Sequence, residues 1–414
     1  MGLTGGEFVA EYLIAEGVPY VFGIPGHGDM AAFDAFKDRS DRIQMIGPRH
    51  EQAAAHMADA YYRASGKALA TMTSIGPGSM NVATGLSTAF VDSIPLISFT
   101  GGPQSYMLGR GVLQELERQQ DNVFPHIIQP MVKRNWDVQH VDLLADVLPR
   151  AFNTMLSGRP GPVHVELPMD VQANVTDLAV PDPASRRATS GAVRPDPDAI
   201  DKAAARLLKA KRPVLLAGGG CLEAEASAEV RKVAEYLDAA VVVTMMGKGV
   251  FPEDHPLDAE HTGANGTLVG NHMTRNADVI LAVGTRFAEQ TSSSYMDGMS
   301  FSIPPTEIIH LDIDPTEIGK NYPTAIGAVC DAKAGLNDLY DALVDHNGTE
   351  GVSRPEYREE IAKLRAEWKE MLTGRWTGKL SLSQVLHKSR EVLPREAIAI
   401  ASAGHPQIQA FQEF

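Results

Sequence analysis

Glu51 is the residue of this sequence whose setting is most suited to chemistry. It follows a short apolar run, residues 43–46, and opens a segment of helical spacing whose other face carries the small residues Ala54, Ala55 and Ala58. We therefore expect its carboxylate at a strand-to-helix junction, facing a cleft. A buried glutamate there can exchange protons with a ligand, whereas in the first turn of an exposed helix it would only stabilise the helix dipole.

Glycine-rich turns follow two of the expected strands. Residues 74–81 contain Gly76 and Gly78 and open a helix, and residues 218–220 are three consecutive glycines. Glycine lets the backbone come close to a ligand, and a helix N-terminus offers free N–H donors. Neither turn has the G-x-G-x-x-G spacing of a dinucleotide site. Each is therefore a tight strand-to-helix turn or a ligand contact of another kind.

The composition excludes several classes of partner. The chain has 414 residues, of which 44% are hydrophobic and 21% charged, and a net charge of -15. This charge argues against nucleic acid or an anionic membrane as partner. The two cysteines, Cys221 and Cys330, have no metal-ligand spacing. No signal peptide and no membrane-spanning run is visible in the sequence, so a cytoplasmic location is expected.

Short apolar segments alternate with helical ones, which predicts an α/β fold with parallel sheets covered on both faces. Ligands bind such sheets at the carboxyl ends of the strands. The expected strands are residues 20–24, 68–73, 95–100, 163–167, 213–217, 239–244, 278–283 and 307–311.

We predict two doubly wound parallel-sheet domains and the start of a third. A Pro-, Asp-, Ala- and Ser-rich stretch without hydrophobic period separates the first two, and a charged helical stretch follows the second. In the last part, residues 380–392 predict a helix and residues 397–401 a strand. The predicted divisions are 1–174, a linker at 175–197, 198–345, a connector at 346–378, and 379–414.

Several short motifs, each weak alone, occur in a common order along the chain. They are FGIPG (22–26), RHEQ (49–52), GPG (76–78) with Asn81, DSIP (92–95), GRPGPV (158–163), MGKG (246–249), VGTRF (283–287) and DID (312–314). Together they resemble the acetolactate-synthase-like branch of thiamine-diphosphate enzymes. The resemblance implies that residues 1–174 bind the cofactor pyrimidine, that 198–345 form the central domain, and that 379–414 begin the diphosphate-binding domain.

The resemblance also implies roles for individual residues. Glu51 would protonate the pyrimidine N1′, which promotes the imino form that takes the proton from the thiazolium C2. Pro25, Gly26, Pro77 and Asn81 would shape the pyrimidine pocket. Gln114, which alone reads as a surface glutamine, would face the substrate across a subunit interface.

In this family FAD often lies along the central domain, and related enzymes hold ADP there or nothing. The sequence after Phe287 departs from the family's Asp-Asp-Arg pattern, so FAD or ADP is an open expectation. The residues that match parts of the nucleotide pattern are Arg159, Gly218, Gly219, Thr244, Gly263, Gly266, Thr267, Gly284, Arg286 and Asp312.

The family's magnesium motif, Gly-Asp-Gly followed by Asn, is absent from the sequence, so no metal ligand is assigned to this chain. Gly404 and Gln407 resemble the family's Gly-x-His-Gln turn, with Pro406 in place of its histidine. We expect a second subunit to supply the rest of the diphosphate-binding domain and its Mg²⁺ ligands. The active site of this fold lies between subunits, which predicts at least a dimer of heterodimers; a truncated chain or a degenerate gene is the alternative.

Three functions remain open at this point. The first is carbon–carbon bond cleavage and ligation next to the carbonyl of a 2-oxo acid, as one subunit of a heteromeric enzyme. The second is a hydrolase or lyase reaction on a cyclic or activated diketone with the same cofactor, which the segments around Gly76 and Gln114 favour. The third is a non-catalytic, nucleotide-binding regulatory subunit, which the missing magnesium motif favours and Glu51 opposes.

Overall fold

The computed structural model describes the chain except residues 1, 116–121, 188–190, 375 and 377. It divides into two compact units, Met1–Ser190 and Gly191–Phe414, called the N-terminal and C-terminal units below. Each unit has its own six-stranded sheet and its own hydrophobic core. The α/β fold with two doubly wound parallel sheets is therefore confirmed.

All neighbouring strands of the N-terminal sheet run parallel, in the order β3-β2-β4-β5-β7-β6. A small antiparallel pair, β1 and β8, lies apart from it. The strands are β1 (Leu3–Thr4), β2 (Tyr20–Ile24), β3 (Gln44–Ile46), β4 (Leu69–Thr73), β5 (Leu96–Gly102), β6 (Asn135–Asp137), β7 (Val163–Pro168) and β8 (Val175–Thr176).

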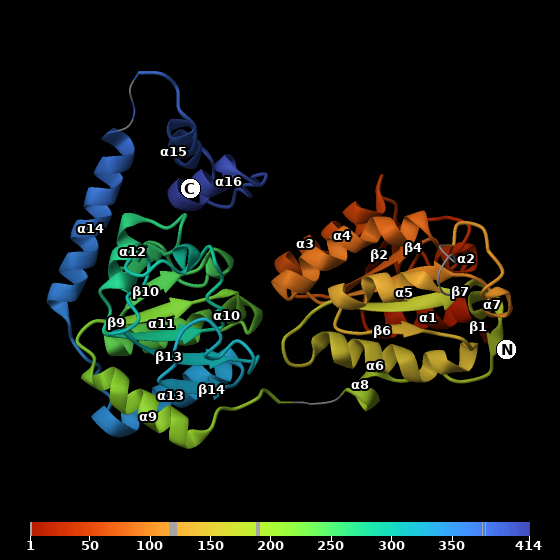
Figure 1. Ribbon diagram of the computed structural model, residues 1–414, viewed down its shortest axis with the longest axis horizontal. Coiled ribbons are helices and arrows are strands. Elements are labelled where there is room, and N and C mark those ends of the chain that lie inside the picture. Colours follow the sequence, from red (N-terminus) through yellow and green to blue (C-terminus); the bar gives the residue numbers. More distant parts are fainter. Residues whose placement is uncertain (1, 116–121, 188–190, 375, 377) are drawn as a thin grey trace. The chain divides into compact units, whose positions relative to one another are not determined.

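Helices cover both faces of this sheet (Figure 1). Helices α1, α2, α6 and α7 contact one another on one face, and α3, α4 and α5 on the other. Helix α1 begins where Thr4 and Glu7 form a reciprocal capping box. The helices are α1 (Gly5–Ala15), α2 (Met30–Lys37), α3 (Glu51–Ser65), α4 (Pro77–Asp92), α5 (Val123–Ile128), α6 (Leu144–Leu156), α7 (Met169–Ala173) and α8 (Pro183–Arg186).

The C-terminal sheet is also parallel throughout, in the order β11-β10-β9-β12-β13-β14. Its central strands are buried on both faces, as apolar runs in parallel sheets predict. The strands are β9 (Pro213–Ala217), β10 (Ala240–Val243), β11 (Asp258–His261), β12 (Val279–Val283), β13 (Glu307–Asp312) and β14 (Ile326–Val329).

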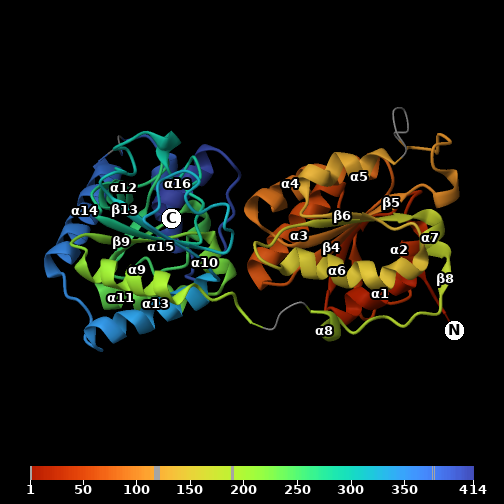
Figure 2. The same ribbon diagram turned by 60° about the horizontal axis from the view of Figure 1, so that its bottom comes forward.

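Helices α9, α10, α11 and α13 gather on one face of this sheet, and α12 and α14 on the other (Figure 2). Tyr357, Ile361 and Leu364 of α14 belong to the buried core, so the charged stretch before residue 378 is a packed helix and not only a connector. The helices are α9 (Pro197–Lys209), α10 (Gly219–Glu223), α11 (Ser227–Leu237), α12 (Leu268–Arg275), α13 (Ala332–Asn347), α14 (Pro355–Gly374), α15 (Leu382–Val392) and α16 (His405–Glu413).

In each sheet the strand order reverses direction beside the first strand of the sheet. In the N-terminal sheet the chain moves from β2 to β3 on one side and then to β4 on the other; in the C-terminal sheet it moves from β9 to β10 and later to β12. Such a reversal opens a crevice at the carboxyl ends of the two central strands, where ligands of open α/β sheets bind. The N-terminal crevice therefore lies between β2 and β4, and the C-terminal one between β9 and β12.

The prediction of a strand at residues 397–401 is wrong. These residues form no regular structure, and Ile398 and Ile400 are almost fully exposed. A strand needs neighbours for its backbone hydrogen bonds, and no described strand pairs with this segment. The predicted linker contains β8 and α8, and the structure divides the chain at residue 190; the finer five-part division stays a prediction.

No helix within the described part of the chain combines the length and the apolar character needed to cross a bilayer.

Candidate active site

Glu51 is the first residue of α3, directly after the connection from β3. His50 caps this helix, because its Nδ1 atom accepts the backbone N–H of Gln52 at 3.2 Å. The position at the strand-to-helix junction agrees with the expectation from the sequence. It puts the carboxylate at the carboxyl edge of the sheet, beside the N-terminal crevice.

Asn81 holds the Glu51 carboxylate from the neighbouring helix. Its Nδ2 atom donates a hydrogen bond of 3.0 Å to Oε2 of Glu51. A side-chain atom added at Gly78 would lie 3.7 Å from Oε1 of Glu51, so the first turn of α4 passes close to the same carboxylate. Glu51 and the first turns of α4, with Pro77 and Asn81, are therefore brought together although they are far apart in the sequence.

The loop after β2 forms another wall of the crevice. The backbone N–H of Gly26 donates to Oδ1 of Asp29 at 2.7 Å, and the N–H of Gly28 donates to Oγ of Ser74 at 2.9 Å. On the other side, Nε2 of the buried Gln172 donates to the carbonyl of Gly28 at 2.7 Å. Pro25 and Gly26 are therefore part of a loop that is fixed to the turn after β4.

Gln114 reaches the same edge of the sheet through its backbone. Gly76 has φ of 63°, and a Cβ atom there would lie 2.0 Å from the carbonyl oxygen of Gln114. Only glycine tolerates both this conformation and this approach. The Gln114 side chain is exposed, and Leu116 and Glu117, which follow it, lie outside the described residues.

Asp29 is the residue of this site that the sequence reasoning missed. It is fully buried, and its Oδ2 atom has no hydrogen-bond partner among the residues that the structure describes. Burial, with a smaller contribution from the charge of Glu51, raises the pKa of Asp29 to about 7. A carboxylate shortly after the end of a predicted strand was the available signal.

A second buried acidic group lies near the end of β7. Burial raises the pKa of Glu166 well above its usual range, and the nearby Asp137 adds to this shift. Asn122 donates a hydrogen bond of 2.6 Å to Asp137. The short apolar segment at residues 163–167 predicted the strand, but the sequence did not show that Glu166 would be buried.

The C-terminal crevice is lined differently, because its glycines contact one another. The N–H of Gly220 donates to the carbonyl of Gly284 at 3.0 Å. A Cβ atom on Gly218 would lie 2.1 Å from that same carbonyl oxygen. Gly218 and Gly284 are therefore needed to pack two loops together, whether or not a ligand binds. Gly219, the first residue of α10, is not held in this way.

The threonines and remaining glycines of the expected nucleotide pattern lie at the same edge of the C-terminal sheet. Thr244 follows β10, and Thr267 caps α12 by accepting the N–H of Gly270 at 3.1 Å. Gly263 and Gly266 are in the loop between β11 and α12. Helix α16, which begins after Gly404 and contains Gln407, packs on this loop through Gln412, whose Nε2 donates to the carbonyl of Asn265 at 2.9 Å.

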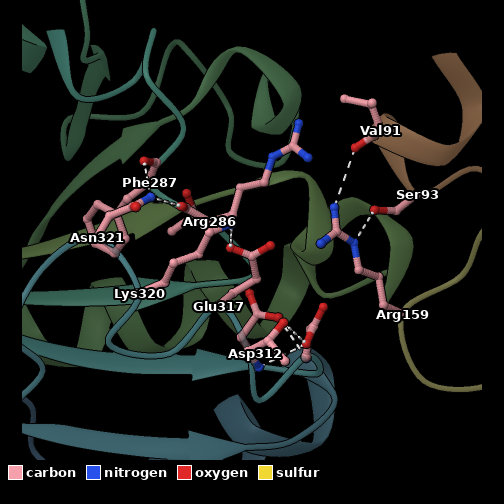
Figure 3. A network of polar contacts seen from close by, with 12 residues as sticks. Val91, Ser93, Arg159, Arg286, Phe287, Asp312, Glu317, Lys320 and Asn321 are labelled. Atoms are coloured by element: carbon pink, nitrogen blue, oxygen red, sulfur yellow. Dashed lines mark hydrogen bonds and ion pairs between the residues drawn. The ribbon is translucent and has the colours of Figure 1, made fainter. Parts of the chain in front are cut away.

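Figure 3 shows the polar contacts of Arg286 and Asp312 within the C-terminal unit. Asn321 donates hydrogen bonds to the carbonyls of Arg286 and Phe287 at 3.2 and 3.0 Å. Asp312, at the end of β13, accepts the N–H of Asp314 at 2.9 Å.

Arg159 belongs to the N-terminal unit, where it ties down the end of α4. Its Nε donates to Oγ of Ser93 at 2.8 Å and its guanidinium also reaches the carbonyl of Val91, as Figure 3 shows. Helix α4 has 16 residues, which corresponds to about 24 Å. Arg159 is therefore far from Glu51, at the opposite end of α4.

Among the described residues, no group of three or more His, Cys, Asp or Glu side chains is arranged to hold a metal ion.

Two protein-family profiles match the chain. Residues 3–122 match the N-terminal TPP-binding domain of thiamine pyrophosphate enzymes, and residues 200–339 match the central domain of the same enzymes. These ranges contain Glu51 and the C-terminal crevice respectively.

Curated relatives agree with the profiles. The chain is 39% identical to a probable acetolactate synthase large subunit of Methanocaldococcus jannaschii, over 83% of this chain and 56% of that protein. It is 33% identical to the acetolactate synthase large subunit of Haemophilus influenzae, over 99% of this chain and 70% of that protein. The isozyme 3 large subunit of Escherichia coli is also 33% identical, over 96% and 65%. The chain thus spans between 56% and 70% of the length of these relatives.

Proposed function

This chain belongs to the family of thiamine pyrophosphate (thiamine diphosphate) enzymes, and we propose that it provides the pyrimidine side of an active site that makes or breaks carbon–carbon bonds next to the carbonyl of a 2-oxo acid. The observation that carries the proposal is the Glu51 carboxylate, held by Asn81 at the carboxyl edge of the N-terminal sheet. The relatives called acetolactate synthase large subunits support the substrate class.

The residues of the N-terminal crevice fit an aminopyrimidine. The Glu51 carboxylate accepts a hydrogen bond from Asn81 on Oε2, which leaves Oε1 for a ring N–H. Gly78 has no side chain to fill the space 3.7 Å from that oxygen. The fixed loop of Pro25 and Gly26 and the first turn of α4 with Pro77 provide the walls.

When bound, the cofactor supplies the nucleophilic carbon and the electron sink of the reaction. Glu51 holds and moves a proton at Oε1, which is the work of a general acid–base group. Asn81 orients the carboxylate so that this oxygen faces the ligand. Gln114, whose backbone lies against Gly76, is proposed to contact the reacting substrate with its side-chain amide.

The diphosphate end of the cofactor and its Mg²⁺ are proposed to bind to protein outside these 414 residues, with a partner chain and an assembly of at least a dimer of heterodimers. The name "large subunit" of the relatives supports a partner. An adenine nucleotide, as ADP or FAD, is proposed for the C-terminal crevice. The position of Thr244, Gly219 and Asp312 at the strand ends supports it, although the contact between Gly218 and Gly284 explains those two glycines without a ligand.

The experiment that tests the proposal is a substrate assay of the intact enzyme, including the protein that completes its diphosphate-binding domain. Consumption of 2-oxo acids is expected with thiamine diphosphate and Mg²⁺, and Glu51→Gln is expected to lower it by about 10²- to 10⁴-fold. Glu356→Gln is the matched control, because Glu356 is also in the first turn of a helix but exposed. Turnover of cyclic diketones instead, or full activity of the Glu51 variant, would contradict the proposal.

A further inference from the structure

Helix α16 lies on the carboxyl edge of the C-terminal sheet. The ring of Phe411 contacts the ring of His261, with centroids 3.8 Å apart and planes inclined by 44°. The Nε2 atom of Gln412 donates to the carbonyl of Asn265 at 2.9 Å and reaches that of Gly266 at 3.4 Å. His261 ends β11, and the two carbonyls belong to the loop that follows it. The helix therefore covers part of the loop that was expected to contact a nucleotide.

This loop, between β11 and α12, uses its own backbone N–H groups. Those of Gly263 and Ala264 donate to Oδ1 of Asn271 at 2.9 Å and to the carbonyl of Gln290 at 2.8 Å. That of Gly266 donates to the carbonyl of Gly263 at 2.9 Å. Phosphate groups need free donors, and these three are taken. The part of the loop beneath α16 instead offers carbonyl oxygens, which suit a ligand group that carries N–H donors.

His261 adds an aromatic surface beside these carbonyls. Burial lowers its pKa to about 3, so the ring is neutral. Its Nε2 atom is buried and has no hydrogen-bond partner among the residues that the structure describes, although buried polar atoms are nearly always paired. Heteroaromatic bases stack on aromatic side chains. A neutral ring next to two acceptor oxygens therefore suits a planar heteroaromatic ring with N–H groups, such as adenine or a flavin.

Phe411 and Gln412 present the same two features from within the chain. Phe411 supplies a ring to His261, and Gln412 supplies N–H donors to the carbonyls. Lys248 also holds the helix, because its Nζ lies 5.5 Å from the centroid of the Phe411 ring and donates to the Phe411 carbonyl at 3.5 Å. Residues 405–407, at the other end of α16, are exposed, and the adjoining α15 has no buried residue. The contact depends on few side chains, so it can open while the C-terminal unit stays folded.

We propose that α16 is an internal competitor for the heteroaromatic ring of an adenine nucleotide: Phe411 and Gln412 occupy a ring subsite beside His261, and the helix leaves when the nucleotide binds. The apparent affinity is then the intrinsic affinity multiplied by the fraction of molecules in which the helix is away. This inference rests on the adenine nucleotide proposed for the C-terminal crevice and adds its regulation.

Two measurements on the 414-residue chain test the competition. Hydrogen–deuterium exchange of the backbone of residues 405–413, followed by mass spectrometry, reports whether α16 is bound. Calorimetric titration with ADP and, separately, with FAD gives the Kd of each nucleotide. Phe411→Ala and Gln412→Ala weaken the contact at its two points. Gln409→Ala is the matched control, because Gln409 is on the same helix and its side chain makes no hydrogen bond within the described residues.

Without nucleotide, α16 should exchange faster in Phe411→Ala and Gln412→Ala than in the natural protein and Gln409→Ala. Both variants should bind the nucleotide with a Kd about tenfold lower, since a lost hydrogen bond or ring contact is worth roughly this factor. Saturating nucleotide should raise the exchange of α16 in the natural protein to the level of the variants. Release of the helix by ADP would identify adenine as the competing ring, and release by FAD alone would identify the flavin.

The proposal is overturned if a nucleotide binds the natural protein while the exchange of α16 stays unchanged. It is also overturned if both variants bind the nucleotide with the natural affinity. A different result separates the two inferences: if neither ADP nor FAD binds the variants, whose helix is free, the proposed nucleotide itself is refuted and the competition with it.

Discussion

The N-terminal and C-terminal units have parallel sheets whose strand order reverses in the same way, yet the residues at the two reversals differ in kind. The N-terminal crevice contains two carboxyl groups, Glu51 and Asp29. Oδ2 of Asp29 has no hydrogen-bond partner among the described residues. Oε1 of Glu51 remains for a ligand, because Asn81 donates to the other oxygen, Oε2. The C-terminal crevice contains glycines that approach one another, Gly218 and Gly284. The same topology thus places carboxyl groups at the crevice of one unit and a close backbone contact at the crevice of the other. The difference teaches that a strand-end glycine is not by itself a sign of a ligand.

Among the substitutions that test this comparison, Gly218→Ala is expected to have the largest effect on stability. The added Cβ would lie 2.1 Å from the Gly284 carbonyl, so the two loops must separate, and we expect a loss of unfolding free energy of about 3 kcal/mol or more. Gly219→Ala is the control, because its Cβ would meet the Met246 side chain at 3.1 Å and can be accommodated by a small shift. Chemical denaturation measures the unfolding free energy of both variants. A Gly218→Ala protein as stable as the natural one would contradict the argument that this glycine is needed for the contact with Gly284.

Asp29 makes the stability of the N-terminal unit depend on pH. Its pKa is raised from 3.8 to about 7 in the folded state, so the folded protein binds the proton more tightly than the unfolded chain. Stability should therefore fall as pH rises from about 4 to about 7, by roughly 4 kcal/mol at most. Asp29→Asn should remove this part of the fall. Denaturation at a series of pH values tests it, and equal slopes for both proteins would refute the burial argument.

Asn81→Ala tests the orientation of Glu51. The variant loses the hydrogen bond of 3.0 Å to Oε2, and a hydrogen bond to a charged group is worth about 1.5 to 3 kcal/mol. We expect the turnover number to fall by about tenfold or more while the protein stays folded. Ser87→Ala is the control, since Ser87 is on the same helix with its hydroxyl bonded to the Thr84 carbonyl. Unchanged turnover in Asn81→Ala would show that Glu51 needs no support from α4.

Arg365→Gln is expected to have the smallest effect on stability. It tests whether the charged neighbours of two buried aspartates, Asp258 and Asp29, act on the pKa in opposite directions. Burial raises the pKa of Asp258, in the C-terminal unit, to about 7, but Arg365 opposes this shift, whereas Glu51 adds to that of Asp29. The guanidinium lies 3.8 Å from the carboxylate and is partly exposed, so we expect the unfolding free energy to change by less than about 1 kcal/mol. The variant should raise the pKa of Asp258 and extend the pH-dependent loss of stability upwards. An unchanged pH dependence of stability would mean that the two residues do not interact.

The sequence predicted the central strands of both sheets, because buried parallel strands are continuous apolar runs with turn residues at their ends. Strands β2 and β9 have the predicted bounds. The edge strand β3 was anticipated only as an apolar run before Glu51. The edge strands β6, β11 and β14 were not predicted, since they are short and half-exposed or carry polar residues such as Asp258. The prediction of a strand at residues 397–401 was wrong, because an apolar segment does not by itself provide a neighbouring strand to pair with.

The site was predicted unevenly for a physical reason. Glu51, Pro77 and Asn81 stand beside recognisable turns, and the structure brings them together. Asp29 was not predicted, because its burial and its oxygen without a hydrogen-bond partner among the described residues are visible only in the folded structure. Arg159, predicted to contact a nucleotide, donates a hydrogen bond to Ser93 at the end of α4; its role and the nucleotide in the C-terminal crevice stay predictions.

The most direct test of the central claim is the exchange of the thiazolium C2 proton for deuterium, followed by quench-flow and proton NMR in the intact enzyme with thiamine diphosphate and Mg²⁺. The natural protein and the control Glu356→Gln should exchange this proton at similar rates, and Glu51→Gln should exchange it about 10²- to 10⁴-fold more slowly. Equal rates in the natural protein and Glu51→Gln would contradict the account, because the N-terminal crevice would then not be the place where the proton moves.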